Sequence, residues 1–287
     1  MEIKASIYRT FVLLFIHKLM IKSFFTALWT IYSLLIFILL GSVFFVVEII
    51  LLSLGNLTYR AAHRWPAIVT KLILFLWGVR VKQHHTSLLD KLPQSVIVIN
   101  HRSDLDALIA TAYMPDIYKF IGKKELTSYP FIGVLVKKLY ITVDRSSKAS
   151  RIQSLRNMKK QGNKGAHIIV FPEGWSNFSE DYLLDLKRGA FKVALDLQLP
   201  IVVCTLTGTH ELYPKPKISL RPGQVNLFWE KLISTQGLNY EDHAEIVKKE
   251  VVNLFLTRLK GVYPEGYPYS KNQRNFNDWV QKQLNKK

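Results

Sequence analysis

The longest apolar stretch of the chain runs from residue 24 to residue 54 and contains one charged side chain, Glu48. A single α-helix of this length would measure about 46 Å, and the hydrocarbon core of a bilayer measures about 30 Å. The stretch is therefore long enough to span a membrane, or to enter one leaflet and bend near Gly41. It is too long, and starts too late, for a cleaved signal peptide.

Basic residues flank this stretch on both sides, so the positive-inside rule does not choose an orientation. Such a balance favours a monotopic or re-entrant anchor whose two ends both meet anionic headgroups. A second helix is expected from Pro66, in its first turn, to Gly78 at its C-terminal end. We therefore predict a two-helix membrane anchor over residues 1–82. The flanking basic residues are Lys4, Arg9, Lys18 and Lys22 before the stretch and Arg60, Arg64, Lys71, Arg80 and Lys82 after it.

From residue 83 onward, short apolar runs alternate with longer mixed segments, which is typical of an α/β domain. The predicted fold class is α/β, with a mixed central sheet flanked by helices and preceded by the helical anchor. One domain over residues 83–287 would hold this sheet, and its tail from about Val262 has no clear period. The expected strands are Ser95–Ile99, Tyr140–Val143, His167–Phe171, Ile201–Leu206 and Val225–Phe228, and the expected helices are Leu105–Tyr113, Ser150–Gln161 and Arg188–Leu197.

The composition limits the classes of binding partner and the kinds of cysteine site that the chain can have. The formal charge of +18 attracts polyanions, namely nucleic acid, anionic lipid headgroups or phosphorylated substrates, and does not choose among them. The single cysteine, Cys204, excludes an intramolecular disulfide and a multi-cysteine zinc site. It lies in an apolar run, so we interpret it as a buried strand residue.

The best candidate for chemistry is the polar block from Asn100 to Asp106, which directly follows an expected strand. His101 has a side chain suited to taking a proton from a hydroxyl near neutral pH. A carboxylate on its other ring nitrogen would hold the tautomer, and either Asp106 or Asp104 could supply it. Ser103 and Asp104 are also common helix caps. His85 and Asp90 share the spacing of His101 and Asp106, but they follow no expected strand.

Two further loops follow expected strands. In Phe171-Pro172-Glu173-Gly174, Gly174 would allow close approach of a backbone, and Glu173 could bind a hydroxyl or a cation. A second Pro-Glu-Gly occurs at residues 264–266, and such a turn alone is more often structural. Arg145 follows the expected strand 140–143, so it could present its guanidinium group to a phosphate.

Taken together and in this order, these blocks resemble the lysophospholipid acyltransferase family, typified by lysophosphatidate acyltransferase. The resemblance covers about residues 96–209. It rests on Asn100-His101-x-Ser103-x-x-Asp106, on Gly122-Lys123-Lys124-Glu125-Leu126 and Pro130-x-x-Gly133 leading to Asp144-Arg145, on Phe171-Pro172-Glu173-Gly174, on Lys187-Arg188-Gly189-Ala190-Phe191, and on Leu199-Pro200-Ile201-Val202 with Gly208-Thr209.

The resemblance implies a mechanism without metal or cofactor. His101 would act as general base on the free glycerol hydroxyl of a lysophospholipid, with Asp106 orienting it and Asp104 the lesser candidate. The hydroxyl would attack the thioester of acyl-CoA or acyl-carrier protein directly, without an acyl-enzyme. Arg145 would hold the acceptor phosphate, and Glu173 with Gly174 would position the glycerol. Ser103 is also expected among the substrate-binding residues.

The chain departs from the family pattern after Gly174. Trp175-Ser176-Asn177 stand where the family has Thr-Arg-Ser, so the usual phosphate-binding Arg is missing, and Lys187 or Arg188 is the expected replacement. The fourth block lacks its usual second proline and has Val203 in that region. Lysophosphatidate remains the leading acceptor, and another lysophospholipid is the alternative.

Other classes of protein are less well supported. A Gly-x-Ser-x-Gly nucleophile elbow does not occur, and Pro214 stands where His210-Glu211 would need a second histidine to bind zinc. A non-catalytic, membrane-tethered polyanion-binding protein would use the +18 charge alone. The acyltransferase interpretation predicts a membrane protein with no nucleic-acid partner. Its active site would face the cytoplasm, at the inner or plasma membrane of a bacterium or at the endomembranes of a eukaryote, because the donor is there.

Overall fold

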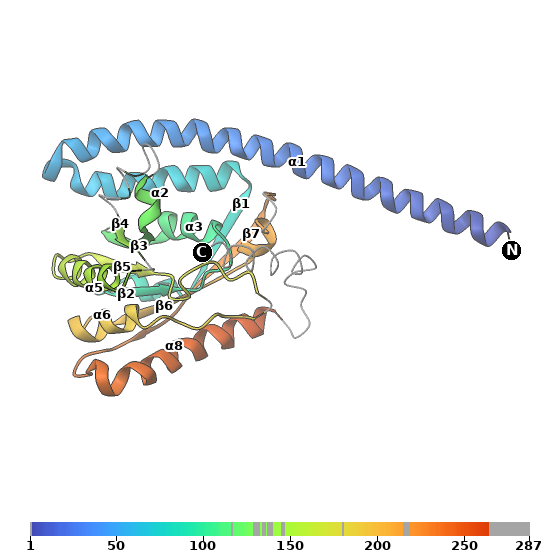
Figure 1. Ribbon diagram of the computed structural model, residues 1–287. Coiled ribbons are helices and arrows are strands. Elements are labelled where there is room, and N and C mark those ends of the chain that lie inside the picture. Colours follow the sequence, from blue (N-terminus) through green and yellow to red (C-terminus); the bar gives the residue numbers. More distant parts are fainter. Residues whose placement is uncertain are drawn as a thin grey trace.

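The computed structural model describes residues 2–115, 117–128, 133, 136, 140–144, 147–179, 181–214 and 219–263. Within these residues, seven strands form one sheet in the order β1-β7-β6-β2-β5-β3-β4 (Figure 1). The strands are β1 (Val79–His84), β2 (Val96–Ile99), β3 (Tyr118–Lys123), β4 (Tyr140–Val143), β5 (His167–Val170), β6 (Ile201–Thr207) and β7 (Gly223–Ile233). The helices are α1 (Glu2–Ser53), α2 (Tyr59–Leu76), α3 (Leu105–Tyr113), α5 (Lys148–Gly162), α6 (Gly189–Leu197), α7 (Thr209–Leu212) and α8 (Tyr240–Val262), with short 3₁₀ turns at 55–58, 86–89 and 124–128.

The predicted mixed α/β sheet is confirmed. Strand β6 pairs antiparallel with β7, and all the other pairings are parallel. The central strands β2 and β6 are buried along their whole length, which explains their continuous apolar sequences. Alternate residues of β2 face opposite sides: Ile97 and Ile99 join the core beneath α2 and α3, and Val96 and Val98 join the core over α6 and α8.

Helices cover both faces of the sheet (Figure 1). Helices α1, α2 and α3 lie on one side, and α6 and α8 lie on the other. Strand β1, which starts at Val79, pairs with β7 within the sheet. Residues 79–82, which we assigned to the anchor, therefore belong to the sheet, and the division of the remaining chain into anchor and catalytic domain stays a prediction.

The predicted anchor helices exist with different bounds. Helix α1 is continuous through Gly41, so the helix is not interrupted there. Helix α2 begins seven residues before the predicted start, and Pro66 lies inside it rather than in its first turn. The packing of Ala62 and His63, which are 0% and 4% exposed, is the reason that the helix extends to the N-terminal side of the proline.

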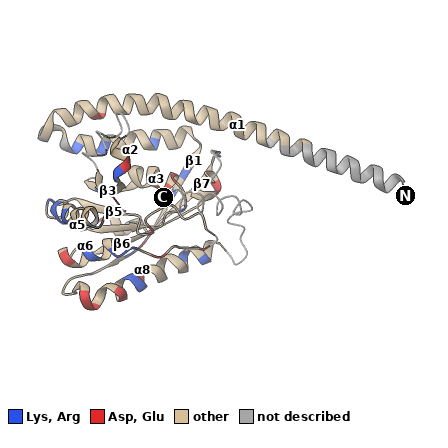
Figure 2. Ribbon diagram, in the orientation of Figure 1, with Lys and Arg blue, Asp and Glu red and all other residues tan. Residues whose placement is uncertain are grey.

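Residues 23–53 of α1 are long and apolar enough to cross a membrane. The ribbon of this stretch carries almost no charged residue (Figure 2), and its single acidic side chain, Glu48, is 0% exposed. A carboxylate is tolerated in so apolar a helix only where it avoids lipid. The surface that residues 23–53 present to their surroundings is therefore almost entirely apolar.

Candidate active site

The C-terminal end of β2 is bonded to the neighbouring strand β6 by the side chain of Asn100. Asn100 is 0% exposed, and its amide nitrogen donates to the carbonyl oxygen of Leu206 at 3.0 Å. Its amide oxygen accepts from the Leu206 N–H at 2.7 Å. These two bonds extend the ladder between β2 and β6 by one residue, so the next residue, His101, leaves the sheet at a defined point.

His101 and Asp106 form a hydrogen-bonded dyad. His101 Nδ1 lies 2.9 Å from Asp106 Oδ2, and the aspartate side chain is fully buried while that of the histidine is 15% exposed. The same oxygen accepts the backbone N–H groups of Arg102 at 2.6 Å and Ser103 at 2.8 Å. Because this oxygen acts as an acceptor toward all three groups, Nδ1 carries the proton and Nε2 keeps its lone pair. The dyad is therefore set up for His101 to act as a base through Nε2.

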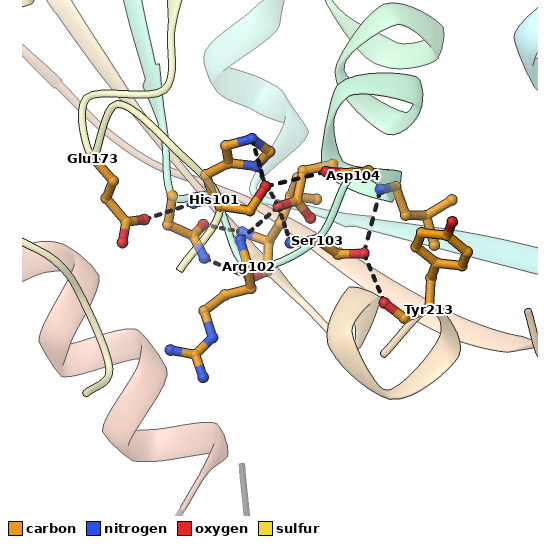
Figure 3. Close-up of polar contacts among 11 residues, drawn as sticks. His101, Arg102, Ser103, Asp104, Glu173 and Tyr213 are labelled. Atoms are coloured by element: carbon orange, nitrogen blue, oxygen red, sulfur yellow. Dashed lines mark hydrogen bonds and ion pairs between the residues drawn. The ribbon is translucent and has the colours of Figure 1, made fainter. Parts of the chain in front are cut away.

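The third block lies directly beside the first. One oxygen of Glu173 accepts the backbone N–H of His101 at 2.7 Å (Figure 3). The other oxygen accepts the N–H of Leu184 at 2.9 Å. Glu173 is 1% exposed, and this burial raises the pKa of its carboxyl group to about 7 although both backbone bonds lower it. The parallel pairing of β2 with β5 brings the two loops together, because both strands end at the same edge.

The loop after Gly174 is tied to the same histidine. The Asn177 N–H donates to the carbonyl oxygen of His101 at 2.6 Å. Arg102, which is 4% exposed, donates its guanidinium N–H groups to the carbonyl oxygens of Ser179 and Asp181. The His101 ring stacks on Phe171 with ring centres 4.3 Å apart. Backbone and ring are thus fixed on several sides, which preorganises the dyad.

Comparison with known proteins identifies the family. The acyltransferase family model matches residues 80–207, which run from β1 to the last residue of β6. Over 207 residues the chain is 28% identical to the 1-acyl-sn-glycerol-3-phosphate acyltransferase of Limnanthes douglasii, covering 70% of this chain and 72% of the relative. The human 1-acyl-sn-glycerol-3-phosphate acyltransferase alpha is 28% identical over 197 residues, covering 68% and 69% of the two chains. This chain belongs to the lysophospholipid acyltransferase family. It is an O-acyltransferase.

The fold of this acyltransferase also matches a solved structure. The crystal structure of the 1-acyl-sn-glycerophosphate acyltransferase PlsC from Thermotoga maritima superposes with a TM-score of 0.67. The match covers 83% of this chain and 95% of the other, at 22% sequence identity.

The structure decides between the two aspartates that the sequence left open. Asp106 contacts His101 Nδ1, whereas Asp104 accepts a hydrogen bond from Ser176 Oγ at 3.2 Å and is exposed at the surface. Ser176 Oγ also lies 3.1 Å from His101 Nε2. Ser176 was not predicted as a site residue, and its only signal in the sequence was its place in the third block.

The other predicted site residues of the acyltransferase lie as follows. Ser103 is 0% exposed and donates to the carbonyl oxygen of Tyr213 at 3.2 Å, while its hydroxyl oxygen accepts the Leu105 N–H at 3.3 Å (Figure 3). These contacts, like those of Glu173, favour a positioning role over the predicted contact with the acceptor.

Gly174 and Lys187 are neighbours. Gly174 has φ +88°, a conformation that glycine adopts without strain. A Cβ atom built on it would lie 3.6 Å from Cγ of Lys187, whose side chain is exposed. Arg145 lies outside the described residues. Cys204 is 0% exposed in β6, which confirms the expected buried strand residue.

Proposed function

We propose that the enzyme transfers a fatty acyl group from acyl-CoA or acyl-carrier protein to the free hydroxyl of 1-acyl-sn-glycerol-3-phosphate, which gives phosphatidic acid. The observation that carries the proposal is the buried Asp106 carboxylate on Nδ1 of a partly exposed His101, at the end of β2. The relatives named above are called 1-acyl-sn-glycerol-3-phosphate acyltransferases, which supports this acceptor.

In the proposed reaction, His101 Nε2 takes the proton of the acceptor hydroxyl as its oxygen attacks the thioester carbonyl carbon. The C–S bond then breaks, and the imidazolium N–H protonates the leaving thiolate. Asp106 stabilises the imidazolium form, because a carboxylate 2.9 Å from Nδ1 favours a positive ring. The reaction also requires that the acceptor hydroxyl and the thioester carbonyl are held in line with Nε2.

The acceptor phosphate is proposed to meet cationic side chains. Arg145 keeps this predicted role, and exposed Lys187 beside Gly174 is the proposed second cation. Glu173 and Ser103 are proposed to act through the backbone of the His101 loop. A different lysophospholipid is the second candidate acceptor, because Ser176 and not an arginine follows Trp175.

The membrane is the proposed source of the acceptor. Helix α2 carries Ile68, Leu72 and Phe75 at 59%, 45% and 76% exposure, and they extend the apolar surface of α1. Lys71 lies among them, as expected for a helix at the headgroup level. We propose that α1 and α2 anchor the enzyme to a membrane, with the active site on the cytoplasmic side.

The test is acyl transfer by the detergent-purified full chain, with acyl-CoA and acyl-carrier protein as alternative donors. The acceptors are lysophosphatidate, lysophosphatidylcholine, lysophosphatidylethanolamine and lysophosphatidylglycerol. Phosphatidic acid as the main product is expected. Preferential acylation of a different lysophospholipid would identify that compound as the acceptor in place of lysophosphatidate. No acylation of any member of the panel would refute the proposed function.

A further inference from the structure

The lone pair of His101 Nε2 is already taken by a hydroxyl of the chain itself. Ser176 Oγ lies 3.1 Å from Nε2, the ring nitrogen on the side opposite Asp106. Because Nδ1 carries the proton that Asp106 accepts, Nε2 is an acceptor and the Ser176 hydroxyl is its donor. A neutral imidazole has one accepting lone pair, so the lysophospholipid hydroxyl of the proposed reaction must displace Ser176 from Nε2.

The Ser176 hydroxyl has a second partner that makes this displacement easier. Asp104 Oδ1 lies 3.2 Å from Ser176 Oγ, nearly the same distance as His101 Nε2. A hydroxyl carries one proton and turns it to whichever acceptor suits. When a lysophospholipid takes the lone pair of Nε2, the Ser176 hydroxyl can donate to Asp104 and is not left without a hydrogen bond.

The backbone of Ser176 is held against the histidine. The Asn177 N–H donates to the His101 carbonyl oxygen at 2.6 Å, and Glu173 accepts the His101 N–H at 2.7 Å. Asn177 is 0% exposed, and its side-chain oxygen accepts the Ser179 N–H at 2.9 Å. The hydroxyl is therefore delivered to Nε2 by a fixed backbone, and only the Ser176 side chain has to turn to clear the nitrogen.

Water is the competing nucleophile at this base. Ser176 is half-buried and the His101 side chain is 15% exposed, so solvent reaches the dyad. A water at Nε2 would be activated in the same way as a lysophospholipid hydroxyl. Water has only its own hydrogen bond with which to displace Ser176, whereas a lysophospholipid adds binding energy from its phosphate and its acyl chain. The Ser176 contact therefore disfavours water more than the lipid.

We infer that Ser176 is a specificity-determining residue that shields His101 from water and yields to the lysophospholipid. The inference rests on the proposed function for its base, donor and acceptor, and acyl transfer stays direct. In the side reaction that Ser176 suppresses, water gives a proton to Nε2 and its oxygen bonds to the acyl carbon. The C–S bond then breaks, and the imidazolium protonates the thiolate, which leaves a fatty acid and the donor thiol.

The experiment measures hydrolysis and transfer side by side with the full chain in detergent. Acyl-CoA with a radiolabelled acyl group is supplied alone or with the lysophospholipid that wild type acylates fastest, and free fatty acid and phospholipid are separated and counted. The variants are Ser176→Ala, which removes the hydroxyl, Ser176→Thr, which keeps one, and Ser176→Ala combined with His101→Ala. The control is Ser234→Ala, at an exposed serine after β7.

Without a lysophospholipid, Ser176→Ala is expected to hydrolyse acyl-CoA about 3- to 10-fold faster than wild type, the factor that one net hydrogen bond gives. Its KM for the lysophospholipid is expected to fall by a similar factor, because no hydroxyl has to be displaced, while kcat of transfer stays within about 3-fold. Ser176→Thr and Ser234→Ala are expected to hydrolyse at the wild-type rate. The double variant is expected to lose the added hydrolysis, because the base is gone.

Hydrolysis by Ser176→Ala at or below the wild-type rate, with transfer reduced, would mean a merely structural role and would overturn the inference. A rise in hydrolysis that persists in the double variant would also overturn it, because His101 would then not activate the water. Transfer by wild type with equal hydrolysis in Ser176→Ala would leave the proposed function standing and refute this inference alone. Absence of transfer to every lysophospholipid would refute both.

Discussion

Replacing Asp106 by asparagine isolates the charge of the dyad. The carboxylate lies 2.9 Å from His101 Nδ1. At an effective dielectric constant of about 20, a full charge pair at this separation is worth roughly 6 kcal/mol. Asparagine keeps an oxygen for the hydrogen bond and loses the charge, so we expect a loss of about 3–5 kcal/mol of transition-state stabilisation, or roughly 10²- to 10⁴-fold in kcat/KM.

The assay is the initial rate of thiol release from acyl-CoA in the presence of lysophosphatidate, with Asp104→Asn as the matched control. Asp104 does not contact His101 Nδ1, so the control is expected to lose less than about 10-fold. The asparagine oxygen can still accept the N–H groups of Arg102 and Ser103, so the thermal midpoint is expected to change little. A double variant with His101→Ala is expected to be no slower than His101→Ala alone.

The reasoning would be refuted if Asp106→Asn retained wild-type kcat/KM within about 10-fold while remaining folded. It would also be refuted if the Asp106 and His101 effects multiplied in the double variant. Either result would mean that the carboxylate does not act through the imidazole.

Three further predictions concern the scaffold around the dyad. Burial raises the pKa of Glu173 to about 7 in the folded protein, from the usual glutamate value of 4.5. The protonated carboxyl group therefore contributes fully to stability below about pH 4.5, and this contribution is lost as the pH rises through 7. Relative to Glu173→Gln, wild type should lose about 3 kcal/mol of unfolding free energy between these two pH values, measured by denaturant titration. Asn100→Ala leaves the buried N–H and carbonyl of Leu206 without their partner and should cost about 2–4 kcal/mol, measured in the same way. Gly208→Ala, at φ +90° with Gln224 O 2.7 Å from the added Cβ, should lower the thermal midpoint and cost at least about 2 kcal/mol.

Each of these predictions has a control in the chain. Glu125→Gln, at an exposed carboxylate, should change the free energy of unfolding by less than about 0.5 kcal/mol. Asn157→Ala, on the exposed surface of α5, should change stability by less than about 0.5 kcal/mol. Gly165→Ala has φ +88° and nothing within 4 Å of the added Cβ, so it should cost about 1 kcal/mol. Equal effects in a variant and its control would contradict the corresponding argument.

The centre of the sheet was predictable because burial on both faces leaves a clear pattern. Val96–Ile99 is a run of four β-branched residues, and the helix that follows, Leu105–Tyr113, has the predicted bounds. The edge strand β1 alternates Val79 and Val81 with Arg80 and Lys82, so it lacked such a run and was missed. These residues form a strand because they pair with β7, and no local pattern reveals that pairing.

Helix α8 was also missed, although a signal was present. Val247, Val251, Phe255 and Leu259 recur every four residues and are the side chains that it buries. Charged residues lie between these positions and obscured the four-residue repeat, so no helix was predicted there. Strand β3 mixes Lys119 and Lys123 with aromatic residues, and its pairing with β5 and β4 makes it a strand.

The dyad was predictable because His101 and Asp106 are local in sequence and follow a strand. The contact of Glu173 with the His101 backbone joins residues 72 positions apart, and it depends on the pairing of β2 with β5. Ser176 was seen only as a departure from a motif. Its role became a question once the structure placed its hydroxyl 3.1 Å from His101 Nε2.

The most direct test of the central claim is the rate of acyl transfer to lysophosphatidate by wild type and by His101→Ala in detergent. His243→Ala, in α8 on the other side of the sheet, is the control. We predict that His101→Ala loses at least about 10²-fold in rate and that His243→Ala retains the wild-type rate. Equal rates from wild type and a folded His101→Ala would contradict the assignment of His101 as the base of this acyltransferase.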